Sequence, residues 1–99
     1  MKFEDIKFVD THVPDGIQAL VPFGDYELSI VKNNTSYGGK NGLYEIGVFK
    51  IEDGEANNMI ELPGITEPGD TVKGFLTEEG VMAIIKKMHL ITGVELSAK

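Results

Sequence analysis

The chain has 99 residues, the length of one domain, and no cysteine, which excludes disulfide frameworks, cysteine-based zinc sites and thiol catalysis. Its 16 acidic and 9 basic residues give a net charge of −7, and every basic residue is lysine. Because a polyanion repels this charge and the planar fork of arginine is missing, we expect no direct nucleic-acid binding.

The first segments predict β-strands separated by turns. Residues 3–9 alternate imperfectly between apolar and polar side chains, so we expect a first edge strand there. A turn follows at residues 12–16, where Pro14 fixes φ and Asp-Gly favours chain reversal. Residues 17–23 then place alternate apolar side chains on one face, and Pro22 restricts this strand to a sheet edge or marks its end.

Two further strands surround a polar loop. The Gly24-Asp25 pair predicts a tight hairpin leading into a strand at residues 26–32. The loop at residues 33–41 separates that strand from another at residues 43–51. Gly47 interrupts the latter, and we expect a bulge there that reassigns its faces. In the first of these strands Tyr26, Leu28 and Ile30 are expected to point inward, and in the second Tyr44, Ile46 and Val48 share one face while Phe49 and Ile51 lie on the other.

One amphipathic helix is predicted near the C-terminal end. Before it, Asp53-Gly54 predicts a turn, residues 59–62 a short strand, and residues 63–70 an irregular loop. Thr77 provides an N-cap and Gly93 a stop, so the helix lies between them. Its apolar positions recur at helical spacing and should pack on a sheet; they are Val81, Ile84, Ile85 and Met88.

These elements predict an α+β fold, with residues 1–99 forming a single domain. The strands are short and follow one another along the chain, so an antiparallel meander of four to five strands is the simplest sheet. We expect the C-terminal helix to pack on one face of that sheet.

The most informative segment is the glycine-rich loop at residues 36–45. It does not match a Walker motif, because Lys40 is followed by Asn41-Gly42 and a strand rather than by Ser or Thr and a helix. Two interpretations stay open: a long hairpin whose glycines supply positive φ, or a flexible recognition loop held out toward a partner. In the second interpretation the binding residues are Tyr37, Gly38, Gly39, Lys40, Asn41 and Tyr44.

The remaining polar residues give no catalytic pattern. His12 between Asp10 and Asp15 is too loosely spaced to predict a metal site, and His89 suits the C-terminal end of a helix. Carboxylates cluster at two turns without the ligand order of a calcium loop, and solvated turns explain them; they are Glu52, Asp53, Glu55, Glu67 and Asp70. We therefore expect no enzymatic activity, no metal and no cofactor.

The N-terminal segment gives no targeting signal. Residues 1–5 are charged and lack the apolar core of a signal peptide, and no apolar run approaches the ~20 residues that span a bilayer. We expect a soluble cytoplasmic protein with no membrane partner.

Three segments carry a resemblance to a known family. They are FEDIKF at residues 3–8, SYGGKNGLYE at residues 36–45 and GFLTEE at residues 74–79. Together they resemble a family of short, uncharacterised tailed-bacteriophage proteins in which a strand, a Tyr-Gly-Gly loop, a second strand and a terminal amphipathic helix recur in that order. The resemblance implies a phage-encoded protein in the host-cell cytoplasm and carries no activity.

The function we expect is that of a small, non-enzymatic accessory protein that binds a host or phage protein. The glycine-rich loop or an exposed sheet edge would meet this partner, with Tyr37 supplying rigid apolar area and Lys40 a steering charge. Three alternatives stay open: a homo-oligomeric structural component, an acidic nucleic-acid mimic, and a small-molecule or nucleotide sponge.

Overall fold

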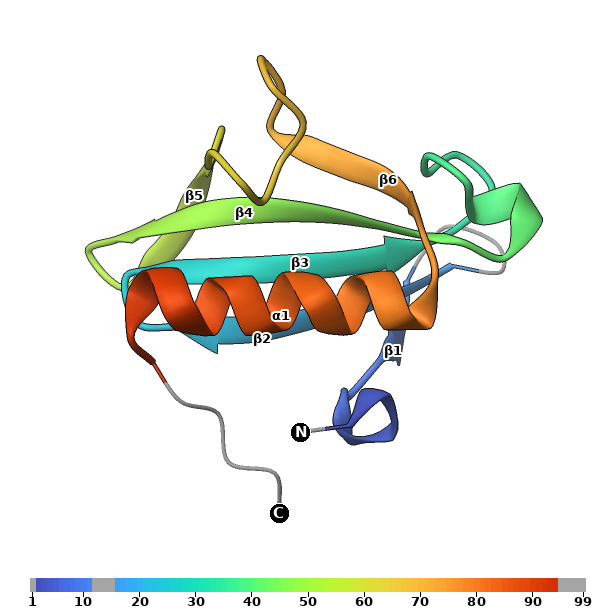
Figure 1. The fold of residues 1–99 in the computed structure, drawn as a ribbon, viewed down its shortest axis with the longest axis horizontal. Coiled ribbons are helices and arrows are strands. Elements are labelled where there is room, and N and C mark those ends of the chain that lie inside the picture. Colours follow the sequence, from blue (N-terminus) through green and yellow to red (C-terminus); the bar gives the residue numbers. More distant parts are fainter. Residues whose placement is uncertain (1, 12–15, 95–99) are drawn as a thin grey trace.

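The computed structural model describes residues 2–11 and 16–94, so the turn expected around Pro14 and the side chains of His12 and Asp15 lie outside the described residues. A six-stranded sheet and one α-helix make up the fold (Figure 1). The elements in chain order are β1 (Val9–Asp10), β2 (Ile17–Phe23), β3 (Tyr26–Lys32), β4 (Tyr44–Glu52), β5 (Glu55–Ile60), β6 (Val72–Leu76) and α1 (Glu78–Thr92), with short 3-10 helices at Phe3–Asp5 and Gly39–Asn41.

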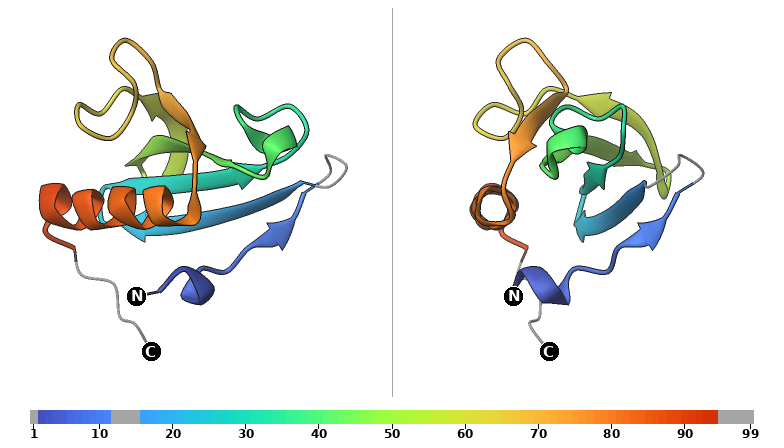
Figure 2. Two further views of the ribbon diagram at one scale, coloured as in Figure 1. Left: turned by 45° about the vertical axis from the view of Figure 1, so that its right-hand side comes forward. Right: turned by 90° about the vertical axis from the view of Figure 1, so that its right-hand side faces the viewer.

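The sheet is an antiparallel meander with one branch. Strands β1 to β5 pair in sequence order, as predicted, and β6 leaves this path to pair with β4. Both β5 and β6 use the same edge of β4: residues 44–47 pair with β6, and residues 48–52 pair with β5. The sheet therefore forks along β4, and Figure 2 shows β5 and β6 diverging beyond it.

The helix α1 packs on one face of this sheet and closes the core (Figure 1). The Thr77 hydroxyl accepts a hydrogen bond from the Gly80 amide at 3.1 Å, and Gly93 ends the helix in the left-handed conformation. The predicted apolar stripe is confirmed, since Val81, Ile84, Ile85 and Met88 are the buried residues of α1. They meet the inward side chains of the strands, among them Phe23, Leu28, Ile30, Ile46 and Val48.

Both predicted tight turns are confirmed. Phe23 pairs with Tyr26 across Gly24-Asp25, and Glu52 pairs with Glu55 across Asp53-Gly54. Asp53 and Gly54 both have positive φ, the combination that matches a tight hairpin to the twist of its strands. As expected, β2 ends directly after the exposed Pro22.

The prediction of a strand over residues 3–9 is wrong. Phe3–Asp5 forms a 3-10 turn, in which the Asp5 carboxylate accepts a hydrogen bond from the Lys2 amide at 2.8 Å, and only Val9–Asp10 pairs with β2. The rings of Phe3 and Phe8 instead pack against Tyr44, with centroids 5.4 and 5.7 Å from its ring. Contact between the aromatic rings outweighs the imperfect strand alternation.

The expected bulge at Gly47 is also wrong, because the β3–β4 register runs unbroken through it. The glycine instead gives space to Met59 of β5: a Cβ at Gly47 would lie 2.6 Å from its Cε. The short strand predicted at residues 59–62 begins earlier, at Glu55, and no strand was predicted over Val72–Leu76. Among the described residues, none of the helices combines the length and apolar character that crossing a membrane requires.

Candidate functional site

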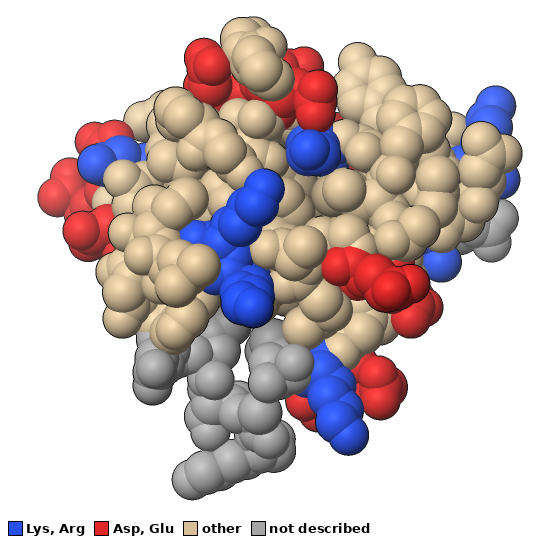
Figure 3. Space-filling model, in the orientation of Figure 1, with Lys and Arg blue, Asp and Glu red and all other residues tan. Residues whose placement is uncertain are grey.

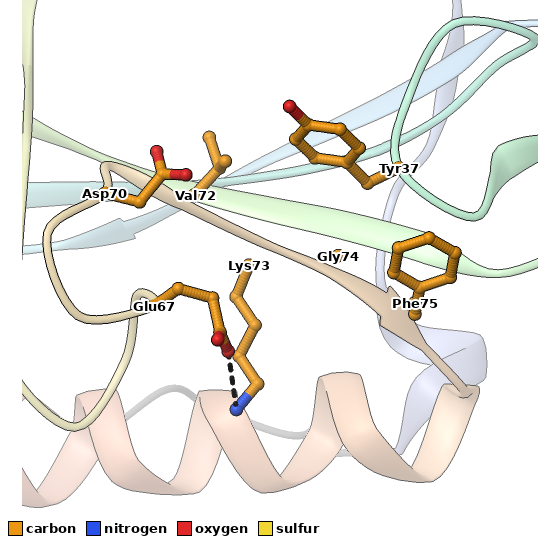
Figure 4. Close-up of a pocket in the computed structure, with 7 residues that line it drawn as sticks. All are labelled: Tyr37, Glu67, Asp70, Val72, Lys73, Gly74 and Phe75. Atoms are coloured by element: carbon orange, nitrogen blue, oxygen red, sulfur yellow. Dashed lines mark ion pairs between the residues drawn. The ribbon is translucent and has the colours of Figure 1, made fainter.

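Two exposed aromatic rings lie side by side where the C-terminal end of β6 meets the loop between β3 and β4. Tyr37, in the loop between β3 and β4, is 57% exposed, and Phe75, in β6, is 63% exposed. Their ring centroids are 6.5 Å apart and their planes differ by 22°, so the two rings lie nearly parallel (Figure 4). Exposed paired aromatics are typical of binding surfaces, because large rigid rings contribute much of the energy of interfaces.

A β-bulge brings Phe75 to this position. Two residues of β6, Gly74 and Phe75, lie opposite one residue of β4, Glu45. Phe75 adopts a φ of 56°, in the left-handed region that bulky residues avoid. Such a backbone costs on the order of 1–2 kcal/mol and persists only where its surroundings hold it. An exposed aromatic ring held on a strained backbone is therefore a candidate functional residue.

The backbone of Tyr37 is fastened to the same bulge. Its carbonyl oxygen accepts a hydrogen bond from the Phe75 amide at 3.1 Å, and its own amide donates to Oε1 of Glu45 at 3.0 Å. The approach requires glycine at position 74, since a Cβ there would lie 2.3 Å from the Cβ of Tyr37. Residues far apart in the sequence thus place the two rings together.

The loop that carries Tyr37 is internally bonded rather than free. The Asn33 side-chain oxygen accepts hydrogen bonds from the amides of Thr35 and Ser36, each at 2.8 Å. The Gly39 amide donates to the Ser36 carbonyl at 3.0 Å, and the Leu43 amide to the Gly38 carbonyl at 3.0 Å. The expectation of a loop held out flexibly is corrected accordingly: its own hydrogen bonds, and the one to β6, fix its course.

A groove of about 330 Å³ runs beside the aromatic pair. Gly74 leaves the backbone of β6 without a side chain at this point, and Val72 adds an apolar contact. Figure 4 shows Asp70, Val72 and Tyr37 on one side of β6, and Lys73 with Glu67 on the other. The groove thus combines aromatic, aliphatic and charged groups within one small volume.

The charged groups of the groove are not all neutralised. The Lys73 ammonium lies 3.5 Å from a carboxylate oxygen of Glu67. Oδ1 of Asp70 accepts a hydrogen bond from the Thr71 amide at 2.6 Å, and over the described ranges Asp70 forms no ion pair. Two carboxylates and one ammonium leave the lining with an excess of negative charge.

The residues expected from the sequence to bind a partner do not all lie at one place in the structure. Tyr37 lines the groove, and Gly38 approaches Phe75 with a positive φ of 88°. Gly39, Lys40 and Asn41 form the adjoining 3-10 turn, in which Lys40 and Asn41 are exposed and lie outside the groove.

Tyr44 does not reach this surface. It is only 6% exposed and belongs to the core, where Phe3 and Phe8 pack against its ring and the Lys32 ammonium lies 4.9 Å from its centroid. Its surroundings give it a role in packing the N-terminal segment onto β4.

Sequence reasoning did not predict Phe75 as a functional residue. The segment lacks regular alternation and contains Gly74, so it predicted no strand, and a left-handed backbone at phenylalanine has no sequence signal. The one available signal was that Phe75 directly follows a glycine and lies two residues before the helix N-cap Thr77. Glu67 and Asp70 were expected as solvated turn residues, and both are exposed.

The described residues gather no set of metal ligands. Among them, no three His, Asp or Glu side chains gather closely enough to hold a metal ion. Nδ1 of His89 lies 2.6 Å from the Val94 carbonyl at the C-terminal end of α1, and His89 does not line the groove. On the face seen in Figure 3, carboxylates lie in separate groups with lysines between them.

In comparisons with known proteins, no family model, no curated protein and no solved structure matches the chain.

Proposed function

We propose that this protein is a small binding protein that captures a partner protein through the surface formed by Tyr37 and Phe75. The observation that carries the proposal is the exposed Phe75 ring on a strained backbone, stacked beside Tyr37. A fold gains nothing from holding an unburied ring in a costly conformation, whereas an interface gains a rigid apolar anchor. Lys40 and Asn41, exposed on the adjoining turn, would form the polar rim.

The setting we propose is the cytoplasm of a phage-infected host cell, with a host or phage protein as the partner. The resemblance of residues 3–8, 36–45 and 74–79 to short tailed-bacteriophage proteins supports this setting.

The test is partner capture with a matched pair of surface variants. Tagged wild-type protein, the Tyr37→Ala/Phe75→Ala variant and the Leu90→Ala/Ile91→Ala variant are expressed in host cells, and captured proteins are quantified by mass spectrometry. Leu90 and Ile91 are exposed apolar residues of α1, so the second variant removes comparable area elsewhere. Circular dichroism and thermal unfolding establish that all three proteins are folded.

We expect one partner to be retained by the wild type and the α1 variant and lost from the Tyr37/Phe75 variant. Equal recovery of that partner with all three proteins would contradict the proposal.

A second candidate function is homo-oligomerisation through β5. In the part of the chain that the structure describes, β5 pairs with β4 alone, so its outer edge offers unpaired backbone groups to another strand. Size-exclusion chromatography with light scattering tests this candidate: a dimer that Asn58→Pro converts to a monomer supports it, and a monomeric wild type at all concentrations removes it.

A further inference from the structure

The groove beside Tyr37 and Phe75 has the chemistry of a site for one cationic side chain. Its volume of about 330 Å³ is at the small end for ligand sites, which suits a single side chain better than a larger cofactor. The lining offers aromatic faces at one end and, at the other, the Asp70 carboxylate, which forms no ion pair with any described residue (Figure 4). An aromatic face and a carboxylate both attract a cation.

Arginine fits this pair of features better than lysine. Its guanidinium is planar, stacks on aromatic rings and donates several hydrogen bonds to a carboxylate at once, whereas an ammonium is a compact and strongly hydrated charge. The chain itself contains no arginine, so no residue of its own could supply this group. Lys73, the lysine that lines the groove, already forms an ion pair with Glu67.

Two other occupants fit less well. An added β-strand along β6 would need free backbone groups, but the Val72 carbonyl already accepts from the Glu67 amide at 3.0 Å and the Phe75 amide donates to Tyr37. A nucleic-acid base could stack on the rings, but its phosphates would meet a groove with excess carboxylate on a chain of net charge −7.

We infer that the groove receives an arginine side chain of the partner protein, with the guanidinium on the Tyr37 ring and its N–H groups turned to the Asp70 carboxylate. Val72 accommodates the aliphatic part of the side chain. The inference rests on the proposed function, because it names the partner chemistry of the same surface.

The test uses Nα-acetyl-arginine methylamide as the probe, added to the full chain labelled with 15N. We expect saturable shifts of the amide signals of residues 70–75 with a Kd on the order of 10 mM, since an exposed ion pair and one cation–π contact each contribute little. The lysine analogue should bind at least ~3-fold more weakly, and the neutral citrulline analogue should cause no saturable shift.

Two charge-matched variants locate the site. Asp70→Asn should weaken arginine binding at least ~3-fold, whereas Asp25→Asn, which removes a carboxylate in the exposed β2–β3 turn, should leave binding unchanged. The inference is overturned if no saturable shift occurs, if lysine or citrulline binds equally well, or if both variants weaken binding to the same extent. Shifts of the same residues by an oligothymidylate instead of arginine would also overturn it.

The capture experiment separates this inference from the proposed function. If Tyr37→Ala/Phe75→Ala loses the partner while Asp70→Asn keeps it and the arginine probe does not bind, the arginine site fails and the binding surface stands. If the arginine probe binds but the aromatic variant still captures the partner, the proposed function fails.

Discussion

The helix-covered face of the sheet and the contact between β6 and the β3–β4 loop use apolar side chains in opposite ways. Under α1, Leu28 and Ile46 are completely buried and lie on regular strands. Where β6 meets the β3–β4 loop, Tyr37 and Phe75 are more than half exposed, and the backbone of Phe75 is strained. The first region gains stability from each apolar side chain, whereas the second keeps apolar area in water at a conformational cost.

In a small domain without a catalytic pattern, this difference indicates which residues are candidates for function. The core cluster contains neither Tyr37 nor Phe75, so these two side chains are free to serve recognition. The hydrogen bonds from Phe75 to Tyr37 and from Tyr37 to Glu45 tie that recognition surface to β4, whose residues Tyr44, Ile46 and Val48 belong to the core. Changes in the two regions should therefore separate stability from binding.

The largest effect is expected from Ile46→Ala. Removing this completely buried side chain should lower the free energy of unfolding by about 3 kcal/mol, because it leaves a cavity under α1. Urea unfolding followed by circular dichroism measures the change. Ile91→Ala, on the exposed side of α1, is the control and should change stability by less than ~0.5 kcal/mol. Equal effects of the two would remove the distinction between core and surface.

The next largest effect is expected from Gly74→Ala in β6. The new methyl group would overlap Tyr37, so the loop should move away from β6 at a cost of about 2 kcal/mol. Amide NMR spectra should change at residues 33–43 and 72–76 and remain unchanged along α1.

Gly80→Ala is the matched control on the helix side. Its nearest neighbour, the flexible end of Leu76, lies 3.2 Å from the new Cβ, so the signals of residues 33–43 should not move. Changes at Tyr37 in both variants would show that the loop is not held by the contact with Gly74.

A smaller effect is expected from Thr77→Ala at the start of α1. Loss of the hydroxyl that accepts from the Gly80 amide should lower stability by about 1 kcal/mol. Thr77→Ser retains the oxygen and should recover most of the loss. Thermal unfolding of the three proteins measures this, and capture of the partner should be unaffected by either substitution.

The smallest effect is expected to be a gain. Phe75→Asn replaces the strained aromatic residue by one that tolerates the left-handed backbone, and should raise the free energy of unfolding by up to ~1 kcal/mol while abolishing partner capture. Phe75→Leu keeps both the strain and an apolar side chain, so no gain in stability is expected. If Phe75→Asn lowers stability instead, the strain at Phe75 does not oppose folding.

Local sequence signals predicted much of the fold. The Thr77 cap, the apolar stripe of α1 and the Gly24-Asp25 and Asp53-Gly54 turns each depend on residues a few positions apart, so the sequence carries them directly. The same holds for the alternation that buries Ile46 and Val48. The failures at residues 3–9 and at Gly47 have a common cause, since distant partners, the Tyr44 ring and the Met59 side chain, decided both.

The sequence by itself determined the α+β class, the meander, and the exposure of Tyr37 as one member of a candidate site. Only the tertiary structure decided that β6 branches from β4, that Gly74 admits Tyr37, and that Phe75, Asp70 and Tyr37 border one groove. The physical reason is the range of the interactions. Periodicity, caps and turns act over a few residues, whereas the groove depends on two segments that meet only after the sheet has formed.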